Sequence, residues 1–148
     1  TKEDEVLIIV GGGYEEKKVR KEAAVKGLSG RVYFAGKCTD RQVLANYYRL
    51  ASVVVIPSER ESFSLVALEA MSSGKPVIAS DIKSLHNRIG EAGLFFKAGS
   101  VEGLRTALDS FFSLPAVQRV SMSKLARELA LSEYSWDGHM ALLEKLYV

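Results

Sequence analysis

Two glutamates, Glu61 and Glu69, have the residue type and spacing best suited to bind a polyhydroxylated ligand. An ionised carboxylate can accept hydrogen bonds from two neighbouring hydroxyls, such as those of a sugar or a ribose ring. Apolar residues surround Glu69 in the sequence, so we expect its side chain to be partly buried. The spacing alone leaves two alternatives open, a structural ion pair with Lys75 and a position exposed to solvent.

A short helix that carries Glu69 is predicted to begin near Phe63 and to end near Ser72. The first turn of a helix has amides without intrahelical partners and a partial positive charge, and both favour a bound anion. We expect a diphosphate to lie against the amides of four residues: Ser62, Phe63, Ser64 and Leu65. An ordinary serine-rich helix start would explain these residues equally well.

Strands and helices are predicted to alternate over the first hundred residues, and helices follow to the end of the chain. Strands are expected at 6–10, 31–35, 53–56, 76–79 and 93–96, and helices at 14–26, 39–50, 63–72, 100–114, 116–131 and from Ser135 onward. Residues 80–90 are expected to form a loop or a short helix. This alternation indicates an α/β fold with a doubly wound parallel sheet flanked by helices.

Local signals support several of these elements. Residues 6–10 are continuously apolar, which is typical of a strand buried on both faces of a parallel sheet. Thr39 and Gln42 have the spacing of a capping box at a helix start. Ser100 is expected to cap a later helix, and Pro115 is expected to end it.

Ligands of such sheets bind beyond the carboxyl ends of the strands. The loops expected at that edge are 11–14, 36–39 and 58–64. Gly12 and Gly13 belong to the first loop, but position 16 is Glu where a dinucleotide-binding glycine pattern needs Gly. Glycines that only turn the chain out of a strand therefore remain the alternative.

Composition excludes several classes of function. A formal net charge of +2, without a basic cluster, argues against nucleic-acid binding. The single cysteine, Cys38, excludes an internal disulfide and suits a reducing compartment. His86 and His139 lack partners at metal-ligand spacing, and no apolar run approaches the ~20 residues of a membrane span. The chain lacks an initiator methionine, so we expect it to be part of a longer protein.

One block of residues resembles glycosyltransferase family 4, which contains retaining, nucleotide-sugar-dependent enzymes of the GT-B fold. The block comprises Ile56-Pro57-Ser58, Glu61, Phe63, Leu65-Val66-Ala67-Leu68-Glu69-Ala70-Met71 and Gly74-Lys75-Pro76-Val77-Ile78-Ala79. The family's Glu-x7-Glu motif falls on Glu61 and Glu69. The similarity extends over nearly all of the chain. It includes Gly11 to Gly13 after the first strand, Phe34-Ala35-Gly36, Tyr48 and Ala51, Tyr134-Ser135-Trp136, and Tyr147 near the end.

The resemblance implies that residues 1–148 form one domain, the Rossmann-like C-terminal donor-binding half of such an enzyme. Glu61 would be the catalytic residue, in contact with the donor sugar, and Glu69 would hold the ribose hydroxyls. The resemblance also implies no metal or other cofactor. The remaining implied contacts are the diphosphate with residues 62–65, the phosphates or the sugar with Gly12 and Gly13, and the base with the backbone of Gly36, Lys37 and Cys38.

The implied donor is a UDP-, GDP- or ADP-linked sugar, and the implied acceptor is a carbohydrate or a lipid-linked molecule. The resemblance implies that the acceptor-binding half, and an Arg and a Lys just upstream of the first strand, lie outside these 148 residues. Alone, the 148 residues are expected to bind nucleotide weakly and to be inactive. A cytoplasmic location is implied, with membrane association through the missing half left open. The loop 80–88 departs from the family pattern. The alternatives are a non-catalytic nucleotide-binding or scaffolding module and an unrelated α/β enzyme such as an epimerase.

Overall fold

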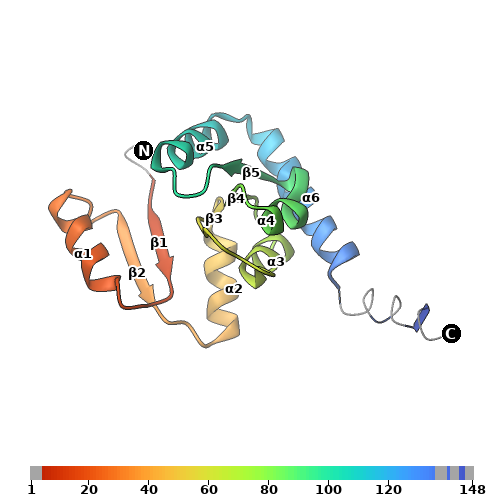
Figure 1. Ribbon diagram of the computed structural model, residues 1–148, viewed down its shortest axis with the longest axis horizontal. Coiled ribbons are helices and arrows are strands. Elements are labelled where there is room, and N and C mark those ends of the chain that lie inside the picture. Colours follow the sequence, from red (N-terminus) through yellow and green to blue (C-terminus); the bar gives the residue numbers. More distant parts are fainter. Residues whose placement is uncertain (1–4, 136–139, 141–143, 146–148) are drawn as a thin grey trace. The chain divides into compact units, whose positions relative to one another are not determined.

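The computed structural model describes residues 5–135, 140 and 144–145, which alternate between strands and helices (Figure 1). The chain divides into two compact units, Thr1–Ala45 (unit 1) and Asn46–Val148 (unit 2). Most of the helix expected from Ser135 onward lies outside the described residues.

Unit 1 contains a two-stranded parallel sheet. It consists of β1 (Leu7–Val10), α1 (Glu16–Val25), β2 (Val32–Gly36) and the first residues of α2 (Arg41–Leu50). The two strands pair in the register Leu7↔Val32 to Ile9↔Phe34, and Gly11 N donates to Gly36 O at 2.8 Å beyond them. Leu7 is 50% exposed and Ile8 41%. The expectation that this strand is buried on both faces is therefore wrong within its own unit.

The start of α2 differs by one residue from the sequence-based prediction. Asp40, not Thr39, caps the helix, because its Oδ1 accepts hydrogen bonds from the amides of Gln42 at 2.7 Å and Val43 at 3.2 Å. A carboxylate at this position also opposes the positive end of the helix dipole. The expected capping box of Thr39 and Gln42 is therefore replaced by a single aspartate cap.

Unit 2 contains a three-stranded parallel sheet in the order β3-β4-β5. Its elements are β3 (Val54–Ile56), α3 (Leu65–Ser72), β4 (Val77–Ser80), α4 (Lys83–Ile89), the 3₁₀ turn η1 (Gly90–Ala92), β5 (Gly93–Phe96), α5 (Val101–Ser113) and α6 (Ala116–Glu133). The register runs from Val54↔Val77 to Ile56↔Ala79 and from Val77↔Gly93 to Ser80↔Phe96. Residues 80–90, left open between a loop and a short helix, contain α4.

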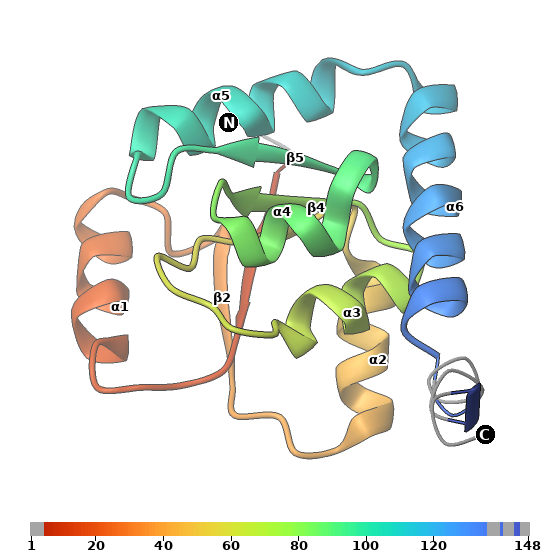
Figure 2. The same ribbon diagram turned by 45° about the vertical axis from the view of Figure 1, so that its right-hand side comes forward.

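Helices pack on both faces of this sheet (Figure 2). Val77 and Ala79 of the central strand face a cluster built with α3, α4 and α6, which includes Met71. Ile78 points to the opposite face and packs with Phe111 of α5. All five side chains are essentially inaccessible, because β4 is flanked by a strand on each side and by helices above and below. Such two-sided burial explains the apolar run Val77-Ile78-Ala79 within this strand.

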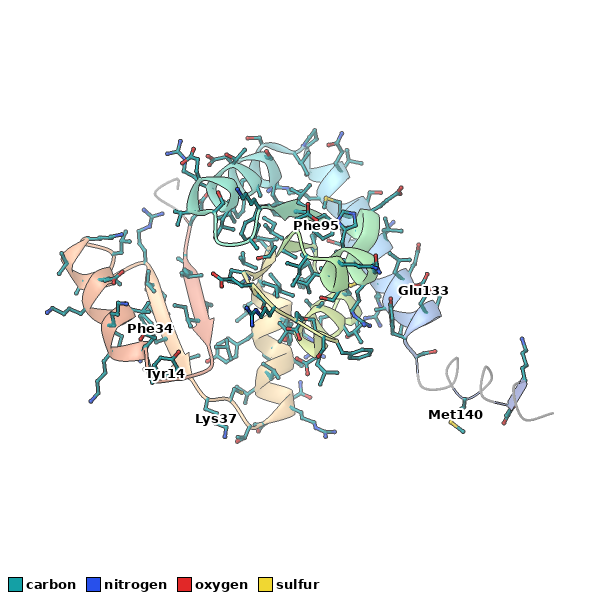
Figure 3. All side chains as sticks on the ribbon, in the orientation of Figure 1. Tyr14, Phe34, Lys37, Phe95, Glu133 and Met140 are labelled. Carbon is teal, nitrogen blue, oxygen red and sulfur yellow. The ribbon has the colours of Figure 1, made fainter. Side chains whose placement is uncertain are left out.

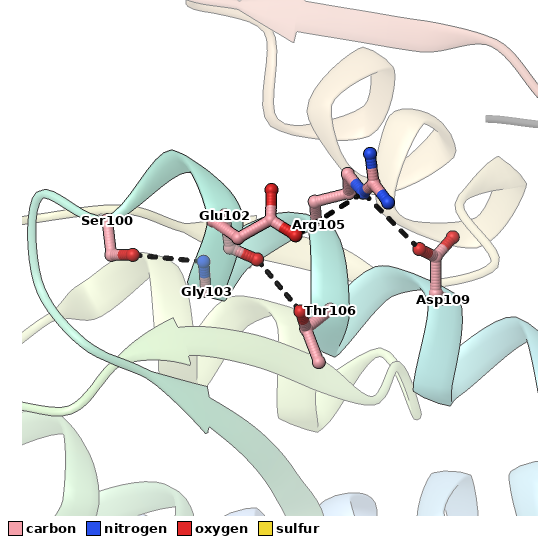
Figure 4. A network of polar contacts seen from close by, with 6 residues as sticks. All are labelled: Ser100, Glu102, Gly103, Arg105, Thr106 and Asp109. Atoms are coloured by element: carbon pink, nitrogen blue, oxygen red, sulfur yellow. Dashed lines mark hydrogen bonds and ion pairs between the residues drawn. The ribbon is translucent and has the colours of Figure 1, made fainter.

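The helix α5 begins and ends where the sequence predicts, and Figure 4 shows the contacts near its beginning. Ser100 Oγ accepts a hydrogen bond from the amide of Gly103 at 3.0 Å, and Pro115 follows the last turn. On the exposed side, Arg105 lies 3.8 Å from carboxylate oxygens of both Glu102 and Asp109. The predictions of a Ser100 cap and of a helix end at Pro115 are confirmed.

The α/β class with parallel strands flanked by helices is likewise confirmed. Within the described residues, no helix combines the length and the apolar character that crossing a membrane requires.

Candidate functional site

The loops that leave the three strands of unit 2 meet at the carboxyl edge of the sheet. The amide of Asp81, directly after β4, donates to Phe96 O at the end of β5 at 2.7 Å. Ser84 Oγ, at the start of α4, donates to the carbonyl oxygen of Glu61 at 2.6 Å. The loop after β5 also approaches this place, because a Cβ atom at Gly99 would lie 3.6 Å from Glu59 Oε1. Parallel strands bring consecutive loops to one edge in this way, and ligands bind there.

An open hollow of about 540 Å³ lies between the Glu61 loop and α4. Its lining residues are Glu59, Arg60, Glu61, Ile82, Lys83, Ser84 and Asn87. The part-buried Glu61 thus lines a concave surface with two cations, Arg60 and Lys83. Glu69 is not one of the lining residues, so the two glutamates occupy separate places at the site.

The second glutamate, Glu69, is exposed, and the expectation of partial burial is wrong. The buried face of α3 consists of Ala67, Ala70 and Met71, which leaves Glu69 on another face of this short helix. Its Oε2 accepts a hydrogen bond of 2.8 Å from the hydroxyl of Tyr48. Lys75 is not engaged with Glu69 among the described contacts, since its Nζ donates to Arg49 O at 2.8 Å.

The hydroxyl of Tyr48 is a lasting donor to Glu69. Burial is the main reason why the pKa of Tyr48 is raised well above its ordinary value, and the hydrogen bond and charge of Glu69 raise the pKa further. The phenol therefore stays protonated at any physiological pH. The sequence offers no spacing signal for this pair, which is separated by 21 positions.

The beginning of α3 presents only part of the expected amide cradle. Ser64 is buried and caps the helix, with its Oγ accepting from the amide of Ala67 at 3.3 Å. The amide of Ser62 donates to Glu61 Oε1 at 3.2 Å. Within the described part of the chain, the amides of Phe63, Ser64 and Leu65 have no assigned acceptor, and neither has that of Val66. An anion could meet these groups without displacing a partner, whereas the amide of Ser62 would first have to release Glu61.

Arg88 of α4 holds Phe63 next to this helix start. Its Cζ lies 3.8 Å from the ring centroid of Phe63 and 4.8 Å from that of Tyr134, which follows α6. Its Nε and Nη1 are buried and have no acceptor among the described residues. Stacking between two rings is thus the main interaction of this guanidinium. No pattern in the sequence pointed to Arg88.

The loop and helix at 80–88, where the sequence departs from the family pattern, are held by further contacts. His86 Nδ1 lies 3.1 Å from Asp81 Oδ1. The imidazole stacks on Phe95 of β5, labelled in Figure 3, with the ring centroids 4.3 Å apart. With Ser84 on the carbonyl of Glu61, this segment forms one wall of the hollow.

The other predicted site residues belong to unit 1. Gly12 and Gly13 follow β1, and Gly36 ends β2 with a φ of 70°, which a glycine adopts without strain. Lys37 is exposed (Figure 3), and Cys38 Sγ donates weakly to Asp40 O at 3.4 Å. The structure therefore places all five at the carboxyl ends of β1 and β2, as expected. Their roles towards a ligand remain predictions.

No group of three or more His, Cys, Asp or Glu side chains gathers as a potential metal site in the described part of the chain. The expectation that the reaction needs no metal or cofactor stays a prediction.

Residues 1–129 match the model of the family "Glycosyl transferases group 1". The chain is 36% identical over 140 residues to D-inositol 3-phosphate glycosyltransferase of Corynebacterium urealyticum, covering 93% of this chain and 32% of that protein. It is 34% identical over 139 residues to the Rhodococcus opacus protein of the same name, covering 88% of this chain and 30% of that protein. The chain thus spans about a third of the length of these relatives.

Solved structures show the same fold. Sucrose-phosphate synthase from Thermosynechococcus elongatus superposes with a TM-score of 0.80 at 32% identity, over 95% of this chain and 37% of that one. HepE from Anabaena, in complex with UDP, superposes with a TM-score of 0.81 at 22% identity. The superposition covers 97% of this chain and 41% of HepE. A likeness at 22% identity supports the fold alone.

Proposed function

Because this chain belongs to the glycosyl transferase group 1 family, we propose that it is the C-terminal, donor-binding half of a retaining glycosyltransferase. The reaction would move a sugar from a nucleotide diphosphate sugar to a carbohydrate or lipid-linked acceptor. The observation that carries the proposal is the placement of Glu61, in a hollow at the carboxyl edge of the sheet, directly before the start of α3. HepE, which has the same fold, has been solved with UDP and with UDP-glucose.

The proposed roles follow from the charges that develop in the reaction. Breaking the bond between sugar and phosphate leaves a diphosphate anion and an electron-poor sugar. The amides of Phe63, Ser64 and Leu65 at the start of α3 would stabilise the anion without a metal. The carboxylate of Glu61 would favour the electron-poor sugar, and the neighbouring Arg60 and Lys83 keep the hollow from being purely acidic.

Glu69 would bind the other end of the donor. Its carboxylate is exposed and still has acceptor capacity after accepting from Tyr48, so it could accept from the ribose hydroxyls. The two glutamates would therefore contact different rings of one ligand, which is why they need not line the same hollow. In unit 1, taken by itself, the proposed ligand contacts are the base with the backbone of Gly36, Lys37 and Cys38, and the phosphates or the sugar with Gly12 and Gly13.

Calorimetric titration of the 148-residue chain with UDP, GDP and ADP tests the proposal. We expect one of them to bind with a millimolar or tighter Kd, and Glu69→Gln to weaken that binding about tenfold by removing a charged acceptor. Glu102→Gln, on the exposed side of α5, is the matched control and should leave the Kd unchanged. No binding by any of the three nucleotides would contradict the proposal.

Transfer is tested in a form of the protein that has transferase activity. There, Glu61→Ala should abolish transfer while leaving the nucleotide Kd within about threefold, because Glu61 is proposed to act on the sugar. Unchanged biological function after Glu61→Ala would instead favour the non-catalytic binding module, for which the unusual segment 80–88 is the supporting feature.

A further inference from the structure

Tyr48 makes a contact that the family-based reading of the site does not use. Tyr48 belongs to α2, and its hydroxyl donates a hydrogen bond of 2.8 Å to Oε2 of Glu69 in α3. We propose that Tyr48 is a positioning residue that orients the carboxylate of Glu69, and that it thereby sets the preference of the site for ribonucleotides over 2′-deoxyribonucleotides. This inference rests on the proposed function, in which Glu69 receives the ribose.

Other contacts hold the donor of this hydrogen bond in place. The ring of Tyr48 packs against the buried cluster on the α3 face of the unit 2 sheet, which includes Ile56 and Met71. The end of α2 is tied to the residues after α3 by a second bond, from Lys75 Nζ to Arg49 O at 2.8 Å. Packing of the ring and this second bond therefore restrict Tyr48 independently of its bond to Glu69.

The acceptor, by contrast, needs such an anchor. Glu69 is exposed on α3, and a glutamate side chain that is held in one conformation loses up to about 2 kcal/mol of rotamer entropy. The bond to Tyr48 restricts the carboxylate before any ligand arrives, and it occupies only one of about four acceptor positions. A ligand hydroxyl then meets a carboxylate that is already oriented, which raises affinity by preorganisation.

A purely structural bond between α2 and α3 is the competing explanation. It predicts that loss of the Tyr48 hydroxyl changes stability and affects all ligands alike. A positioning role predicts a loss confined to ligands that present both ribose hydroxyls. The two explanations can therefore be separated by a pair of ligands that differ in one hydroxyl.

The experiment measures Kd values of the 148-residue chain for UDP, GDP and ADP and for their 2′-deoxy counterparts. The variant is Tyr48→Phe, which keeps the packed ring and removes only the hydroxyl. Tyr33→Phe is the matched control. Tyr33 is an exposed tyrosine of unit 1, and its hydroxyl donates to Gly30 O and not to Glu69. Glu69→Gln is the second variant and keeps the inference testable if Tyr48→Phe folds poorly.

We expect the original chain and Tyr33→Phe to prefer the ribonucleotide. Tyr48→Phe should bind it about 3- to 10-fold more weakly, a typical effect of one hydrogen bond, with little change for the 2′-deoxy form. The combination of Tyr48→Phe with Glu69→Gln should lose no more than Glu69→Gln alone, because both changes act through one carboxylate.

Three outcomes would overturn the inference. In the first, Tyr48→Phe raises the Kd for the ribonucleotide and for the 2′-deoxyribonucleotide equally. In the second, it changes neither Kd. In the third, the losses of Tyr48→Phe and Glu69→Gln add fully in the double variant. Each of these leaves the proposed function intact if the original chain binds a nucleoside diphosphate. Absence of such binding to the original chain would refute the proposed function itself, and the inference with it.

Discussion

Gly93, the first residue of β5, is the position where one added methyl group should do most harm to the sheet that supports the site. Its backbone is extended, with a φ of −137°, so any residue could adopt it and steric contacts alone decide the outcome. A Cβ atom there would lie 2.4 Å from Ile89 Cγ2 and 2.7 Å from the carbonyl oxygen of Val77. The side chain of Ile89 can rotate, but Val77 O belongs to the central strand, which is paired on both sides.

The cost of Gly93→Ala follows from this geometry. To bring the contact with Val77 O from 2.7 to 3.0 Å, β5 must move by at least 0.3 Å from β4. Overpacking of this kind costs about 1–3 kcal/mol, and the lower entropy of the unfolded chain returns about 0.4–1 kcal/mol. We therefore expect a net loss of about 1.3 kcal/mol, or roughly 4 °C in Tm for a domain of this size.

Thermal unfolding followed by circular dichroism measures this loss. The control is Gly30→Ala, because a Cβ atom at Gly30 would meet no atom within 4 Å and its φ is not positive. It should change Tm by no more than about 2 °C. Equal Tm values for Gly93→Ala and Gly30→Ala would refute the steric argument, and so would an increase in Tm for Gly93→Ala.

Two further predictions concern the helix α2. Asp40→Ala should destabilise the protein by about 1 kcal/mol, because it removes the acceptor of two amides, whereas Thr39→Ala should have little effect; equal losses in urea unfolding would contradict the aspartate cap. The second prediction follows from the raised pKa of Tyr48. A raised folded-state pKa contributes stability that is fully present below the unfolded value of 10 and is lost as pH rises above it. Stability measured from pH 8 to 12 should therefore fall more steeply in the original chain than in Tyr48→Phe, and parallel curves would contradict this reading.

Local signals were enough to predict the secondary structure and the segment that carries the proposed chemistry. The apolar run of β4, the Ser100 cap and the break at Pro115 depend on residues close together in the chain, and the structure has them where they were expected. The order of strands and helices followed from the same signals. The Thr39 cap shows their precision, since the structure places the cap one residue later.

Contacts between distant parts of the chain decided the rest of the site. Tyr48 meets Glu69 across 21 positions, Ser84 meets the carbonyl of Glu61 across 23, and Arg88 contacts the rings of Phe63 and Tyr134. The exposure of Glu69 likewise depends on which face of α3 the sheet and α6 cover. No local pattern encodes these contacts, because they arise from how the helices cross and pack, and side chains that are far apart in the chain become neighbours only after the core has formed.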